Sequence, residues 1–135
     1  MAAFKFNGFK VLRMNFEAKE KFVKDDQNYE FNIGHDFSIN GTHMSVKLGT
    51  NNTNDFPFKY NVLIQGEFDY VDSEDSDGIG FKAFRANALA ILFPYLRTIV
   101  AQVTAISEFE AVTLPTINMI QYLENADLRE TNSQN

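Results

Sequence analysis

Apolar and polar residues alternate along residues 29–39. Every second position is apolar or His35, and the positions between are polar or glycine: Tyr29, Phe31, Ile33, His35, Phe37 and Ile39 alternate with Glu30, Asn32, Gly34, Asp36 and Ser38. A period of two predicts a strand with one buried face. Asn40-Gly41 follows directly, and both residue types tolerate positive φ, so we expect a two-residue type I′ hairpin turn there. Such a turn sets the register: Ile39 pairs with Thr42, Phe37 with Met44, His35 with Val46 and Ile33 with Leu48.

Two other segments have strand patterns. Residues 10–19 alternate with one apolar face, made of Leu12, Met14, Phe16 and Ala18. Residues 56–70 do the same, with an apolar face of Phe58, Tyr60, Val62, Ile64, Phe68 and Tyr70. Gly66 lies among these residues and indicates a bulge or a close approach of another segment. Connections rich in turn-forming residues join the strands, so we predict a four-stranded antiparallel meander with one solvent-exposed face.

From Phe81 onward the apolar spacing becomes helical. Phe81, Phe84, Ala88 and Leu89 indicate a short helix or helical turn. A long helix is predicted to begin at 89–91, which places Pro94 in its first turn, where a missing N–H is tolerated. Apolar residues at three- and four-residue spacing give this helix a seam for a sheet or another helix: Leu92, Leu96, Ile99, Val103 and Ile106. A last helix is predicted to start at Pro115-Thr116 and to make contacts through Ile117, Ile120 and Leu123.

Length and composition limit the class of protein. The 135 residues fit one α+β domain, which we predict over residues 1–128, with a disordered tail over 129–135. The 14 Phe residues fit either a Phe-rich core or an apolar groove or subunit interface. A net charge of −6 disfavours nucleic-acid binding, and the absence of Cys excludes disulfides and thiolate metal sites. No signal-peptide pattern and no apolar run approaching a membrane span is apparent, so we expect a cytoplasmic protein without membrane insertion.

Residues that carry chemistry are sparse. His35 lies on the apolar face of its strand, where a hydrogen-bonded core or interface histidine is the usual role, and His43 is expected to be solvated beside the turn. The acidic run over residues 69–80 lacks the ligands of a calcium loop at Ser73 and Phe84. No phosphate-binding glycine motif is present. We therefore predict no catalytic residues, no metal and no cofactor, and an enzyme is not expected.

The order of these elements, together with three local motifs, resembles the bacterial export chaperone family SecB. Ile64-Gln-Gly-Glu-Phe68 resembles the family's Gly-x-Phe strand end, and Leu92-Phe-Pro-Tyr95 with Arg97 resembles the opening of its long helix. Leu114-Pro-Thr-Ile-Asn118 resembles the opening of its last helix, with one extra residue between Pro115 and Asn118. The resemblance covers most of the chain in order, while the N-terminal half matches by pattern only.

The resemblance implies an ATP-independent holdase, a chaperone that binds non-native polypeptides in apolar grooves. In the family two subunits join sheets, and the dimers pack through their long helices into a tetramer, so a homo-oligomer (dimer or tetramer) is expected. The implied client-binding residues are Tyr95, Met119, Leu123, Phe81 and Phe84. The seam residues of the long helix are the expected oligomer interface: Leu92, Leu96, Ile99 and Val103. A core position is the alternative for each client-binding residue.

Two departures from the family bear on protein transport. The export chaperone typically ends in a zinc-binding tail that docks on the motor SecA, whereas the C-terminal residues here contain no Cys and no His. The motor also docks on acidic residues of the sheet, and four outward positions here carry no acid: Lys59, Asn61, Leu63 and Gln65. SecA is therefore a doubtful partner. SecB-like chaperones also protect antitoxins, so the alternatives are an interaction protein dedicated to one partner, such as an antitoxin, and a small-molecule binder or enzyme with a pocket beneath the crossover.

Overall fold

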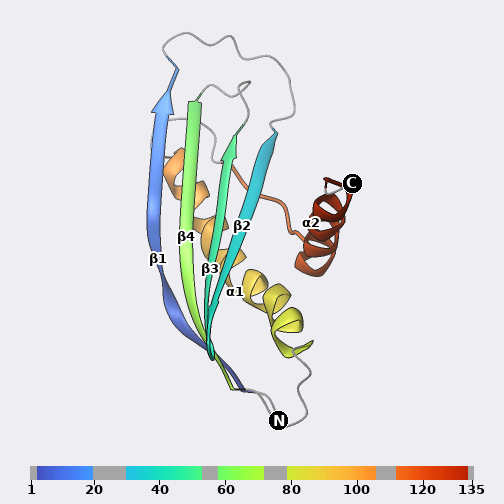
Figure 1. The fold of residues 1–135 in the computed structure, drawn as a ribbon. Helices are drawn as coiled ribbons and strands as arrows, with labels where there is room; N and C mark the ends of the chain where they lie inside the picture. Colours follow the sequence, from blue (N-terminus) through green and yellow to red (C-terminus); the bar gives the residue numbers. More distant parts are fainter. Residues whose placement is uncertain (1–2, 20–29, 53–57, 72–78, 106–111, 134–135) are drawn as a thin grey trace.

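The computed structural model has a four-stranded antiparallel sheet with one long helix across one face and a shorter helix at its side (Figure 1). It describes residues 3–19, 30–52, 58–71, 79–105 and 112–133. The strands are β1 (Ala3–Ala18), β2 (Phe31–Asn40), β3 (His43–Asn52) and β4 (Phe58–Val71). The helices are α1 (Ile79–Ala105) and α2 (Met119–Ser133). The predicted α+β class is confirmed.

The strand order is β1-β4-β3-β2, so the predicted meander is correct only for β2, β3 and β4. β1 lies beside β4, with Phe4 opposite Tyr70 and Phe16 opposite Tyr60. An alternating pattern shows which face of a strand is buried but not which strand is its neighbour. The meander was therefore wrong at its first strand, and β1 and β2 form the two edges of the sheet.

The β2–β3 hairpin forms with its register shifted by two residues from the predicted one. Asn40 pairs with His43, so the turn residues are Gly41 and Thr42, and Phe37 pairs with Val46 instead of Met44. Gly41 has φ of 62° at the first turn position, where type II′ turns place glycine. The predicted Asn40-Gly41 turn is wrong, but a register shift of two residues leaves every side chain on its predicted face.

β1 contains two irregularities that its alternation does not reveal. The register shifts between Phe6 and Phe9, where Gly8 has φ of 105°, and again between Val11 and Arg13. Each shift inserts an extra residue, as a β-bulge does. Leu12 therefore lies in an irregularity and does not share a regular face with Met14, contrary to the prediction.

The core lies between the inner face of β3 and β4 and one side of α1. Its fully buried members are apolar, among them Met44, Val46, Leu48, Val62, Ile64, Phe68, Leu89, Leu92, Leu96 and Val100. Burying a Leu, Ile or Phe side chain stabilises a fold by about 1.5–3 kcal/mol. Gly66 permits the close approach of α1, because a Cβ there would lie 2.6 Å from a methyl carbon of Leu92.

Both helices differ from their predicted bounds. α1 begins at Ile79 and includes Pro94 in its interior, so the predicted start at 89–91 is wrong. α2 begins at Met119, after Asn118, whose side-chain oxygen accepts a hydrogen bond from the backbone N–H of Gln121 at 3.1 Å. This contact is an N-cap, which explains why the helix starts after Asn118 and not at Pro115. α2 extends to Ser133, so the predicted disordered tail is wrong for residues 129–133.

One segment of α1, Phe84–Ala105, is long and apolar enough to cross a membrane. The prediction that no run approaches this length is corrected here. The segment packs on the sheet, and Leu92, Leu96 and Val100 are fully buried there. The core helix of a soluble protein meets the same criteria of length and composition, so this feature is weak support for a membrane role.

Candidate binding surface

Exposed apolar side chains gather on the edge strand β1. Val11 is 45% exposed, Leu12 42% and Met14 56%. Val11 and Met14 pair with Ile64 and Val62, which places them on the face that α1 covers elsewhere. Val11 and Met14 therefore lie on the inner face of the sheet and stay exposed there.

Tyr95 of α1 extends this apolar surface. Its ring centroid lies 4.5 Å from that of Phe9 and 6.1 Å from that of Phe6, both on β1, while 42% of Tyr95 stays exposed. We call Val11, Leu12, Met14 and Tyr95 the β1 apolar surface. Exposed apolar groups that gather on one surface mark interaction sites more often than scattered ones do.

A hollow of about 1030 Å³ lies beside the end of β1. It is lined by Met14, Asn15, Phe16, Glu17, Asn32, Asn51, Asn52, Lys59, Tyr60 and Asn61. Four of these residues form one row across the sheet, because Asn15 pairs with Asn61, Asn61 with Asn51, and Asn51 with Asn32. Asparagine amides both donate and accept hydrogen bonds, so this row offers partners for main-chain amides as well as for polar side chains.

The predicted client-binding residues do not share one surface. Tyr95 is exposed, but Met119 and Leu123 are each only 4% exposed within a single chain. Phe84 packs against Phe4, with ring centroids 4.7 Å apart, and against Tyr70 at 4.8 Å. The side chain of Phe81 lies outside the described residues.

The predicted oligomer interface is largely internal. Leu92 and Leu96 have no exposed surface and Val103 has 5%, so these residues have almost no area left to bury against a second subunit. Ile99 is partly buried. The outward face of α1 instead carries Ala90, Pro94, Thr98 and Gln102. The interface assignment of Leu92, Leu96 and Val103 is therefore not retained.

α2 is fixed beside the edge strand β2. The hydroxyl of Tyr122 donates to the carbonyl oxygen of Ile33 at 3.3 Å and lies 2.7 Å from Nδ1 of His35. When Nδ1 of His35 carries a proton, it donates to the Tyr122 oxygen while the Tyr122 hydroxyl donates to Ile33, so both contacts are hydrogen bonds. Burial raises the pKa of Tyr122. The expected hydrogen-bonded role of His35 is confirmed, and its partner is a helix residue that no strand pattern indicates.

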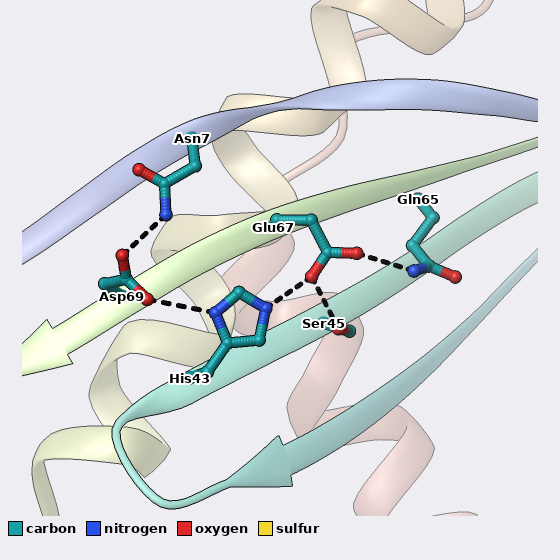
Figure 2. Close-up of polar contacts among 6 residues, drawn as sticks. All are labelled: Asn7, His43, Ser45, Gln65, Glu67 and Asp69. Carbon is teal, nitrogen blue, oxygen red and sulfur yellow. Dashed lines mark hydrogen bonds and ion pairs between the residues drawn. The ribbon is translucent and has the colours of Figure 1, made fainter.

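A polar network covers the outer face of the sheet around His43 (Figure 2). Nδ1 of His43 lies 3.0 Å from Asp69 and Nε2 lies 2.6 Å from Glu67. Ser45 and Gln65 also donate to Glu67, each at 2.6 Å. Both ring nitrogens face carboxylates, so a protonated His43 donates one hydrogen bond to each. The side chain of His43 is 40% exposed, in agreement with the predicted solvated position, but its carboxylate partners became identifiable only with the β3–β4 register.

The network shifts the pKa values of its members. Hydrogen bonds to Asp69 and then Glu67 raise the pKa of His43 above 6.5. The hydrogen bonds from His43 and Asn7 lower the pKa of Asp69. Burial acts to raise the pKa of Glu67, but its hydrogen bonds from Ser45, Gln65 and His43 together lower it.

This network does not have the geometry of a catalytic triad. The Ser45 hydroxyl donates to Glu67, and both nitrogens of His43 are engaged by carboxylates, so no base is positioned to activate the serine. Among the residues that the structure describes, no group of three or more His, Asp or Glu is arranged to hold a metal ion.

Comparisons with known proteins identify the fold. No protein-family model matches the chain. An uncharacterized protein from Methanocaldococcus jannaschii is 28% identical over 142 residues, which cover 98% of this chain and 90% of the relative. The SecB-like chaperone Rv1957 of Mycobacterium tuberculosis, solved in complex with a ChAD peptide from the HigA1 antitoxin, has a TM-score of 0.67 at 16% identity, covering 84% of this chain and 87% of that one.

A second solved structure, a protein of unknown function from Streptococcus agalactiae, has a TM-score of 0.53 at 12% identity, covering 86% of this chain and 99% of that one. At these identities the likeness concerns the fold. The chain has a SecB-like fold, in which an antiparallel four-stranded sheet is combined with two helices.

Proposed function

We propose that this protein is a SecB-like chaperone that binds non-native polypeptides without ATP, acting in the cytoplasm. The observation that carries the proposal is the β1 apolar surface, which stays exposed although the adjacent core is closed. Unfolded segments are recognised mainly by burial of apolar side chains, which does not depend on direction. Met and aromatic side chains suit such binding, because they adapt to many partners.

Within this proposal Tyr95 is retained as a client-binding residue, and Val11, Leu12 and Met14 join it. Met119 and Leu123 are assigned to the core, in line with their low exposure. Phe84 holds β1 and β4 together through Phe4 and Tyr70 and is not assigned to client binding.

Assembly into a dimer or tetramer is part of the same proposal. The outward residues of α1, Ala90, Pro94, Thr98 and Gln102, are the surface left for helix–helix contact. Delivery to SecA is not part of the proposal. The outer-face acids Glu67 and Asp69 are bonded to His43, which reduces their availability to a basic partner.

The alternative is a chaperone or assembly protein dedicated to one partner, such as an antitoxin. The likeness to a SecB-like chaperone bound to an antitoxin peptide favours this alternative. A panel of unrelated unfolded clients distinguishes the two, because a dedicated protein responds to one sequence and a general holdase responds to many.

The proposal is tested by aggregation suppression. A slowly refolding, aggregation-prone client is diluted from denaturant with increasing amounts of this protein, without ATP, and light scattering is followed. We expect suppression that saturates near one client per oligomer. Tyr95→Ala is expected to weaken client binding about fivefold, since about 1 kcal/mol of apolar contact is lost. Lack of suppression at several-fold excess with every client tried contradicts general holdase activity.

A further inference from the structure

The outer face of the sheet, away from α1, contains a hollow of about 290 Å³. Gly34 and Gly49 lie opposite each other at its floor, so neither β2 nor β3 contributes a side chain there. Around them lie Arg13, Leu63 and three asparagines, Asn32, Asn51 and Asn61. Pockets for small molecules have volumes of about 300–1,000 Å³, so this hollow suits a group of the size of one side chain.

Nothing in the local backbone requires glycine at position 34. Positive φ occurs at Gly8 and Gly41, and Gly34 does not have this conformation. A Cβ at Gly34 would meet no heavy atom within 4 Å, so packing does not exclude a side chain either. Glycine inside a strand weakens that strand, because it has no side chain to pack and loses more conformational freedom on folding. Gly34 therefore keeps the hollow open at the expense of strand stability, as expected of a site that receives a ligand.

Leu63 and Arg13 complete the row that begins with the two glycines. Gly49 pairs with Leu63 of β4, and Leu63 pairs with Arg13 of β1. A methyl carbon of Leu63 lies 3.0 Å from where a Cβ of Gly49 would be, so the leucine side chain lies over Gly49 and forms an apolar wall. Arg13 is exposed, and no ion pair joins it to an acid among the described residues. The row therefore ends in a guanidinium whose charge is available to a ligand.

Two further cations lie in the next row across the sheet. Lys47 and Lys10 lie on either side of Gln65, and neither belongs to an ion pair within the part of the chain that the structure describes. Asp36, opposite Lys47, is the acid of this row. Together with Arg13 the cations outnumber this acid, so the surface beside the hollow is basic in a chain of net charge −6.

The asparagines lie in the row on the other side of the hollow. Asn32 pairs with Asn51, and Asn51 pairs with Asn61. Nδ2 of Asn32 donates to Oδ1 of Asn51 at 3.1 Å, so the amide nitrogen of Asn51 keeps its own two donors. Amide N–H groups and a guanidinium are donors that a carboxylate readily accepts from.

We propose that this hollow binds a carboxylate side chain of an acidic segment in a partner polypeptide. Arg13 is the charged anchor, because its guanidinium can donate two parallel hydrogen bonds to one carboxylate. The asparagine amides donate to the same group, and Leu63 contacts its methylene carbons. Lys10 and Lys47 attract further acids of the segment. The hollow lies on the opposite face of the sheet from the β1 apolar surface, so the inference goes beyond the proposed function and does not depend on it.

Charge selects among the possible occupants. A basic segment would bring its charges against those of Arg13, Lys10 and Lys47, and like charges repel. A neutral segment would form no hydrogen bond between two charged groups. The three cations make a small patch on a chain of net negative charge, which suits a short acidic segment better than a long polyanion such as a nucleic acid.

Peptides without apolar side chains test the recognition of charge, because they do not engage the β1 apolar surface. Three short Gly/Ser peptides with a neutral fluorophore carry equal numbers of Glu, Gln or Lys, and their binding to the full chain is followed by fluorescence anisotropy at low salt. We expect the Glu peptide to bind about tenfold more tightly than the Gln peptide, a difference that added salt reduces, and the Lys peptide to bind most weakly. Arg13→Gln should remove most of the difference between the Glu and Gln peptides. Arg129→Gln on α2, which changes the net charge equally, is the matched control and should preserve it.

Filling the hollow separates binding from folding. Gly34→Val places a side chain in the hollow and a better strand former in β2. We expect this change to weaken binding of the Glu peptide at least about fivefold without lowering the midpoint of urea unfolding. Ser38→Val, on the same face of β2, is the matched control and should leave the affinity for the Glu peptide unchanged. Aggregation suppression should be equal for Gly34→Val and the unmodified chain.

Each outcome decides part of the proposal. Unchanged affinity of Gly34→Val for the Glu peptide overturns the hollow as the site, and equal binding of the Glu and Gln peptides overturns the recognition of a carboxylate. If Gly34→Val does not fold, the comparison of Arg13→Gln with Arg129→Gln still decides the matter.

Two competitors test the class of partner. Free glutamate at the same carboxylate concentration should compete poorly with the Glu peptide, and equal competition would assign the hollow to small carboxylic acids. A single-stranded oligonucleotide of equal charge should bind more weakly than the Glu peptide, and tighter binding would assign the hollow to a nucleic acid. Either contrary result overturns the acidic polypeptide as the partner.

Discussion

The burial of Leu123 decides whether α2 packs against the core or leaves an open groove for a client. Its side chain is 4% exposed and belongs to the buried apolar cluster, whereas Ile120, three residues earlier on the same helix, is 61% exposed. A client-binding groove would require Leu123 to be accessible. Leu123→Ala, with Ile120→Ala as the matched control, therefore measures which description holds.

The expected magnitudes follow from burial. Replacing a buried Leu by Ala lowers the free energy of unfolding by about 2–5 kcal/mol. The lower half of that range is expected for Leu123, because α2 lies at the periphery of the fold, where neighbouring side chains can relax. We expect Leu123→Ala to lower the free energy of unfolding by about 2–3 kcal/mol. Ile120→Ala removes little buried surface and introduces the better helix former, so a change within about 0.5 kcal/mol is expected.

Urea denaturation followed by circular dichroism provides the measurement, with both variants compared at equal protein concentration because oligomerisation affects apparent stability. If Leu123→Ala and Ile120→Ala unfold at the same urea concentration as the unmodified chain, Leu123 is a surface residue. That result would refute the closed placement of α2 and return Leu123 to the client-binding set. Leu123→Asp is a poor substitute, since a buried carboxylate unfolds a core and blocks a groove alike.

Three other predictions concern single contacts. His43→Gln should lower the thermal midpoint most above the ordinary carboxyl pKa values of 3.8 and 4.5 and below the ordinary histidine pKa of 6.5. The difference from the unmodified chain should fade as pH rises through the raised pKa of His43, and a difference that does not depend on pH would contradict the network. Gly66→Ala should destabilise by about 1–3 kcal/mol through its clash with Leu92, and an unchanged midpoint in urea would show that α1 is not so close to β4. Tyr122→Phe should destabilise by about 1 kcal/mol and speed amide exchange in α2, because the hydrogen bond between the Tyr122 hydroxyl and His35 is lost; unchanged exchange would count against the link.

The sequence predicted strand faces better than strand neighbours. The alternation in residues 29–39 and 56–70 identified the inner faces of β2 and β4, because burial of one face imposes a period of two. Nothing in that period indicates that β1 crosses to pair with β4. The hairpin register depended on whether Asn40 or Gly41 opens the turn, and both residue types fit a two-residue turn.

The candidate surface was harder to predict than the fold. Tyr95 was identified through the resemblance, but Val11, Leu12 and Met14 were read as part of an ordinary strand. Their exposure follows from the bulges in β1 and from the limited reach of α1, and both are tertiary features. Leu92 and Leu96 were assigned to an interface because a helical seam has the same spacing whether it packs on a sheet or on a second subunit.

The most direct test of the central claim places an environment-sensitive fluorophore on the β1 apolar surface. Met14→Cys carries the label, and Lys47→Cys on the outer face serves as the control in a chain that has no other cysteine. On titration with an unfolded client, the account predicts a saturable blue shift and rise in intensity for the label at position 14, and little response at position 47. An equal response at both positions, or none at position 14 while aggregation is still suppressed, would contradict the claim that this surface binds the client.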